Sequence, residues 1–127
     1  MLFIALLLAC TAGGDSGAAG DPTLRIVTPT ADQTVCGDPL LVEIEVTNFD
    51  LVAPVSDPDL AEPGTGHVDI TLNGQDVDMI WDTQADIPGV ADGAWQLKAE
   101  LSNSDHSPVQ PYVSDLIYIT IDHERCP

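Results

Sequence analysis

The sequence predicts a single all-β domain, an antiparallel β-sandwich of about seven short strands, and three observations support this fold class. Several segments alternate apolar and polar residues with a period of two, as strands do when one face is core and the other is water. Proline, glycine, asparagine or aspartate bounds each of these segments. No segment sustains a period of 3.6 residues between helix caps, so we expect almost no helix.

The strands that we expect are short and follow one another in chain order: 24–27, 34–36, 40–49, 67–72, 76–82, 94–101 and 113–121. The alternation is clearest in the third strand, whose inward set is Leu40, Val42, Ile44 and Val46. The last two strands have the inward sets Trp95, Leu97, Ala99, Leu101 and Ile117, Ile119, Ile121. Asn73-Gly74 separates the fourth and fifth strands and predicts a type I′ hairpin, because both residues tolerate positive φ.

Length and charge limit what this domain can do. The 127 residues suffice for one domain, and 44% of them are hydrophobic, too many for a disordered acidic tail. Three Lys and Arg stand against 21 Asp and Glu, which gives a formal net charge of −18. Nucleic acids and anionic lipid surfaces attract the opposite charge, so we exclude both as binding partners of the domain surface.

The predicted hairpin and the strand after it have a pattern found in other proteins. Gly66–Gly74, Gly93–Leu101 and Asp105–Pro108 together resemble the central hairpin and following strand of immunoglobulin-like domains in bacterial surface lipoproteins. The resemblance implies a single immunoglobulin-like antiparallel sandwich. It implies no activity, because such domains carry many unrelated functions. The Cys…Trp…Cys pattern of antibody domains is missing, since no Cys lies on the strand around Leu97.

An apolar run over residues 2–9 opens the chain and ends at Cys10. A membrane span needs about 20 such residues, so this shorter run fits the hydrophobic region of a signal peptide. Leu7-Leu8-Ala9-Cys10 also resembles the bacterial lipobox, which implies that Cys10 carries palmitate-type acyl chains and becomes the first residue after cleavage. The alternative is an ordinary signal peptide in which Cys10 is a passive residue.

The chain therefore divides into three predicted parts. Residues 1–9 form a lipoprotein signal peptide, residues 10–22 form the lipidated Cys and a flexible tether, and residues 23–127 form the immunoglobulin-like domain. The tether prediction rests on Gly, Ala, Ser and Asp, which dominate that segment. Thr11 rather than Asp follows Cys10, which by its resemblance to lipoprotein sorting in enteric bacteria implies the outer membrane.

Cysteine parity predicts a disulfide. If Cys10 is lipidated, Cys36 and Cys126 remain as an even pair in an exported chain, and we expect them to be joined. A metal site built on these two residues is the alternative, but it lacks any C-x-x-C spacing.

Four residues are candidate ligands for a metal ion. His67 and Asp69 share the outward face of one predicted strand, while Asp105 and His106 lie in the turn before the last strand. If that turn folds back beside His67, the four side chains form a nitrogen and oxygen site for a transition metal. No H-x-H, H-x-x-x-H or EF-hand spacing supports such a site, and an outward His on an acidic protein is usually solvated. We therefore expect no bound cofactor.

Two acidic features leave alternatives open. The excess of Asp reflects either life in salty water or weak Ca²⁺ binding in loops such as Asp86–Gly93. The long segment Phe49–Gly66 carries three prolines and several acidic residues, and is either a partner-contact loop or a solvated connection.

These observations predict a non-catalytic protein of the cell envelope. The chain contains neither a phosphate-binding Gly loop nor a nucleophile elbow, so we do not expect an enzyme. We expect a membrane-anchored surface lipoprotein whose sandwich is an interaction or spacer module, with other surface proteins or glycans as partners. The alternative is an extracytoplasmic binder of a metal ion or small ligand.

Overall fold

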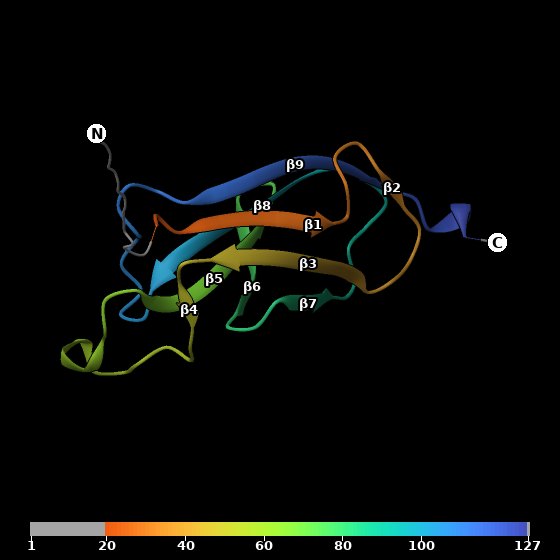
Figure 1. Ribbon diagram of the computed structural model, residues 1–127. Coiled ribbons are helices and arrows are strands. Elements are labelled where there is room, and N and C mark those ends of the chain that lie inside the picture. The colour runs from red at the N-terminus through yellow and green to blue at the C-terminus, as the bar shows by residue number, and fades with distance from the viewer. Residues whose placement is uncertain (1–19, 127) are drawn as a thin grey trace, which may run out of the picture.

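The computed structural model describes residues 20–126 as a sandwich of two β-sheets (Figure 1). Seven strands have four residues or more and two are shorter: β1 (Thr23–Thr28), β2 (Thr34–Val35), β3 (Leu40–Thr47), β4 (Asp50–Leu51), β5 (Thr65–Leu72), β6 (Gln75–Ile80), β7 (Gln84–Ile87), β8 (Gly93–Asn103) and β9 (Ser114–Ile121). Two short 3₁₀ turns complete the described part: η2 (Pro58–Leu60) and η3 (His123–Arg125). No helix within it is long and apolar enough to cross a membrane. The predicted all-β sandwich is confirmed.

The two sheets differ in size. The smaller sheet has the order β1-β3-β7, and both of its pairings are antiparallel. The larger sheet has the order β2-β9-β8-β5, with β4 and β6 both pairing with β5. The long strands of this sheet pair antiparallel, while β2 and β4 add short parallel pairs at its margins. Among the described strands β6 pairs with β5 alone, so it forms an edge of the sheet.

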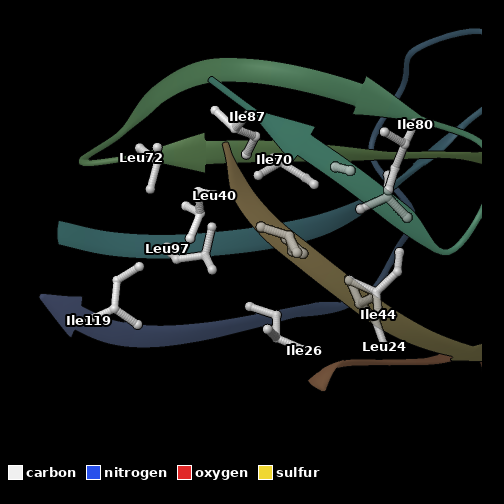
Figure 2. Close-up of a cluster of buried hydrophobic side chains, with 14 of the residues drawn as sticks. Leu24, Ile26, Leu40, Ile44, Ile70, Leu72, Ile80, Ile87, Leu97 and Ile119 are labelled. Carbon is white, nitrogen blue, oxygen red and sulfur yellow. The ribbon is translucent and has the colours of Figure 1, made fainter. Parts of the chain in front are cut away.

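The core lies between the two sheets, and both contribute to it (Figure 2). Its strand-borne members are the buried aliphatic residues Leu24, Ile26, Leu40, Val42, Ile44, Val68, Ile70, Leu72, Ile80, Ala85, Ile87, Leu97, Ala99, Leu101, Ile119 and Ile121. Val46, Trp95 and Ile117 pack against this cluster and are partly buried. Every inward position predicted for β3, β8 and β9 therefore contributes to the core, because alternation places successive side chains on opposite faces.

The β5–β6 hairpin forms at the predicted turn. Leu72 pairs with Gln75, and the two residues between them have positive φ, 51° at Asn73 and 83° at Gly74. A type I′ turn requires this backbone conformation, and Asn-Gly adopts it at little cost.

Two strands lie outside the predicted ranges, the two-residue β4 and the four-residue β7. Gln84–Ile87 forms β7, whereas the sequence predicts an acidic loop from Asp86 to Gly93. Ala85 and Ile87 are buried, and Asp86 pairs with Leu41 of β3. The strand is only four residues long, so its alternation is too brief to stand out from the surrounding acidic residues.

The two ends of the sandwich are built differently (Figure 1). At the loop end, which we define as the end where Gly20 lies beside Asn48, the segments 52–64 and 104–113 leave the sheets. At the opposite disulfide end, Cys36 after β2 is bonded to Cys126 after η3, with their Cα atoms 5.1 Å apart across 90 residues of sequence. The predicted disulfide is confirmed.

Candidate functional site

The site begins at a close contact between the backbones of β5 and β8. Gly66 pairs with Asn103, and a Cβ atom at Gly66 would lie only 1.8 Å from the carbonyl oxygen of Ser102. No side chain fits at that separation, so glycine is required at this position. The close approach places His67 of β5 directly opposite Ser102 of β8.

Beyond β8 the chain turns back tightly. The backbone N–H of Asn103 donates to the carbonyl of Ser107 over 2.8 Å, and the N–H of His106 donates to the carbonyl of Asn103 over 2.8 Å. The Asp105 carboxylate accepts hydrogen bonds from the side chain and the N–H of Ser107, at 2.6 and 3.0 Å. These bonds hold the pKa of Asp105 below its usual value. They also fix the turn that carries His106.

This turn covers His67. The two imidazole rings meet edge to face with their centroids 5.0 Å apart, and His67 is 0% exposed while His106 is exposed. The expectation that His67 is solvated is therefore wrong. Its position in the register is the predicted one, on the outer face of the sheet with Asp69, but residues almost forty positions later in the chain fold over it.

The His67 ring has no hydrogen-bond partner at either nitrogen. Its Nε2 lies 3.4 Å from the Oδ1 atom of Asp69, close enough for an ion pair but without hydrogen-bond geometry. The other oxygen of Asp69 accepts a 2.6 Å hydrogen bond from the hydroxyl of Ser102. Burial lowers the pKa of His67, the Asp69 carboxylate opposes this, and His106 lowers the pKa further. His67 is therefore a neutral imidazole at neutral pH.

A hollow of about 230 Å³ opens beside these side chains on the outer face of the larger sheet. Its lining consists of Asp69, Thr71, Asp76, Lys98, Glu100, Ser102, His106 and Pro108. Three carboxylates face one ammonium group there, and Lys98 is already 3.2 Å from Glu100. An excess of carboxylate in a concave site favours a cation over an anion.

The structure thus brings three of the four predicted metal ligands together. His67 contacts both Asp69 and His106, and these two residues line the same hollow, whereas the hydrogen bonds of the Asp105 carboxylate go to Ser107. Within residues 20–126, no three His, Cys, Asp or Glu side chains are already grouped to hold a metal ion.

Ser102 was not among the site residues predicted from the sequence. Extending the alternation of β8 by two residues beyond Glu100 would place Ser102 on the outer face, but only the register shows that it reaches Asp69.

Two other predicted sites have different outcomes. Cys10, the predicted lipidation site, lies outside the described residues. The acidic stretch near Asp86–Gly93 has its carboxylates in different surroundings, since Asp86 belongs to β7 and Asp92 accepts a 3.0 Å hydrogen bond from the N–H of His123. The expectation of a loop over this stretch is therefore wrong at its start, because Asp86 is held in the strand β7.

The segment Phe49–Gly66 is only partly a loop. Its base is closed by backbone hydrogen bonds from Asp50 to Gly64 and from Val52 to Gly66, and Val55 donates to Ser104 over 3.1 Å. Leu60 at its far end is 65% exposed. The segment therefore has a fixed base beside the His106 turn and an exposed tip.

Comparisons with known proteins identify the fold. No protein-family model matches the chain, and no curated protein does. A fibronectin(III)-like module of Clostridium thermocellum CbhA is similar in structure, with a TM-score of 0.57 and 17% identity over 80% of this chain and 97% of the module. An engineered protein is similar with a TM-score of 0.54 and 13% identity, over 87% of this chain but only 21% of its own. CopC from Methylosinus trichosporium OB3b gives a TM-score of 0.48 at 20% identity. At such identities the likeness to the first two structures establishes a fibronectin-like or immunoglobulin-like β-sandwich and nothing finer.

Proposed function

We propose that this protein is a non-catalytic lipoprotein, tethered to the outer membrane through Cys10, whose sandwich is an interaction or spacer module. The observation that carries the proposal is the fold. The described residues form one sandwich, and its likeness to the fibronectin(III)-like module extends over 97% of that module. Sandwiches of this kind serve widely as building blocks of extracellular and surface proteins.

The position of Gly20 supports display from one end. Cys10 precedes Gly20 by ten residues, and a chain of that length spans at most about 36 Å. An anchor at Cys10 therefore holds the loop end near the membrane and lets the disulfide end point outward.

Exposed apolar side chains support an interaction role. Val77 and Met79 occupy alternate positions of the edge strand β6, and Trp81 continues the same alternation just after it, 47% exposed. Tyr118 on β9 is 59% exposed. Tyr and Trp combine large contact area with a polar group and are enriched in binding surfaces, which fits surface proteins or glycans as partners.

Lipidation can be tested directly. Wild-type cells should incorporate labelled palmitate into the protein, and the protein should enter the detergent phase on phase separation. Cys10→Ala should abolish the label and move the protein to the aqueous phase, because an apolar run of eight residues is too short to hold it in a bilayer. Cys36→Ala is the matched control and should keep the label. Membrane partitioning of the Cys10→Ala variant would show that the anchor lies elsewhere.

One observation favours the alternative function, an extracytoplasmic binder of a metal ion or small ligand. The turn at residues 103–107 folds back beside His67. The metal site predicted from the sequence requires this fold-back.

A further inference from the structure

A fully buried histidine without a hydrogen bond is unusual. More than about 90% of buried polar groups have a partner, so an unpaired one needs an explanation, such as a bound ion or water molecule. Both ring nitrogens of His67 are unpaired and the side chain is 0% exposed. Its Nε2 faces the Asp69 carboxylate, which lines the 230 Å³ hollow. The unpaired Nε2 of His67 therefore lies beside a carboxylate that lines an acidic hollow, and His106, whose ring contacts that of His67, lines the same hollow.

We propose that His67, Asp69 and His106 bind a divalent first-row transition metal ion. Imidazole and carboxylate ligands suit ions such as Zn²⁺ and Cu²⁺. Two ligand atoms on a tetrahedral zinc ion, each about 2.0–2.1 Å from it, lie roughly 3.4 Å apart. His67 Nε2 and Asp69 Oδ1 are separated by this distance, 3.4 Å. Two imidazoles on one such ion have centroids about 5 Å apart, and those of His67 and His106 are 5.0 Å apart.

Only one ligand has to move. The three side chains do not yet converge on one point, and the ring of His106 lies edge to face with His67. His106 is exposed, so its ring can rotate to present a nitrogen, and exposed side chains do so within nanoseconds. The other two ligands are held in place, His67 by burial and Asp69 by the hydroxyl of Ser102. Such hydrogen bonds to ligating carboxylates are typical of metal sites. This inference goes beyond the proposed module function and does not depend on lipidation.

The test is calorimetric titration of Zn²⁺ and Cu²⁺ into the full chain in detergent, with Cys10→Ser in every sample so that no free thiol competes. We expect micromolar or tighter binding of one ion per chain. His106→Asn and Asp69→Asn should each weaken it at least tenfold. Asn tolerates the positive φ of 72° at residue 106, and at residue 69 its amide oxygen can still accept from Ser102, so both variants should fold. A melting curve in chelator verifies this.

His123→Asn is the matched control. His123 also faces an aspartate, with 2.8 Å between its Nδ1 and Asp92, but it lies beyond β9 near the disulfide. This variant should bind both metals as wild type does, and Ca²⁺, which prefers six to eight oxygen ligands, should not compete. Dissociation constants above about 100 μM, unchanged affinity in His106→Asn, or an equal loss in His123→Asn would each overturn the proposal.

Discussion

Each end of the sandwich carries a histidine that faces an aspartate, and the two pairs differ in burial. At the loop end His67 is completely buried and lies 3.4 Å from Asp69. At the disulfide end His123 lies 2.8 Å from Asp92, and the two side chains are 37% and 52% exposed. Bulk water reaches the polar atoms of the exposed pair, but it does not reach those of His67.

The difference follows from how each end is closed. A covalent bond joins Cys36 to Cys126, so the disulfide end does not depend on packing around its histidine. The loop end is closed by the turn after β8, whose His106 packs against His67. Next to this contact, the backbone of Gly66 lies close to the carbonyl of Ser102. Stability at this end therefore depends on steric fit and on the charge state of one imidazole.

The largest effect that we expect comes from the steric fit. Gly66→Ala puts a Cβ atom against the Ser102 carbonyl, and the strands must separate to accept it. We expect a loss of more than about 4 kcal/mol in the free energy of unfolding, or failure to fold, measured by urea unfolding. Gly37→Ala near Cys36 is the control, because nothing lies within 4 Å of its added Cβ, and it should unfold like wild type. Similar stability of the two variants would contradict the close contact.

A smaller effect should follow from opening the disulfide end. Cys36→Ser with Cys126→Ser removes a bridge that closes a loop over 90 positions, so the denatured chain gains freedom. We expect a loss of about 2–5 kcal/mol. Reductant should lower the wild-type melting temperature in the same direction and leave that of the double variant unchanged. The prediction would be contradicted if reductant left the wild-type melting temperature unchanged and alkylation detected two free thiols.

The smallest effect concerns the charge of His67 in the metal-free chain. Burial lowers its pKa in the folded state, whereas the unfolded chain binds the proton near pH 6.5. Between these two pKa values the unfolded state holds more protons, so stability is complete above about pH 6.5 and falls as the pH drops below it. In chelator, the melting temperature should decrease from pH 7.5 to pH 5.5.

Two variants test whether His67 causes this decrease in melting temperature. His67→Gln should flatten the pH dependence, while His123→Gln, at the exposed pair, should retain it. An unchanged slope in His67→Gln would place the titrating group elsewhere.

Local patterns in the sequence predicted most of the fold. The alternation of β3, β8 and β9 and the Asn73-Gly74 turn depend on neighbouring residues alone, so they could be seen without a structure. The disulfide was predicted from the parity of the cysteines, on the expectation that the chain is exported and Cys10 is lipidated. The strand β7 was missed because a four-residue strand gives only two inward positions, Ala85 and Ile87.

The candidate site was predictable only in part. The alternation placed His67 and Asp69 on one face, and the turn residue His106 was singled out by its chemistry. The burial of His67 could not be predicted, because it depends on a turn about forty residues later and on strand register. The requirement for Gly66 and the bond from Ser102 to Asp69 are likewise contacts between distant parts of the chain.

The edge strand β6 has a consequence wherever many copies of the chain are crowded together. An edge strand can pair with the edge of a neighbouring molecule, and this is a common start of aggregation. Asp76 and Asp78 lie along β6, so pairing between two copies would bring carboxylates together on chains that each carry a formal charge of −18. Like charges facing each other across strands are destabilising. The edge therefore disfavours lateral stacking of crowded modules, and high salt, which screens the carboxylates, should weaken this protection.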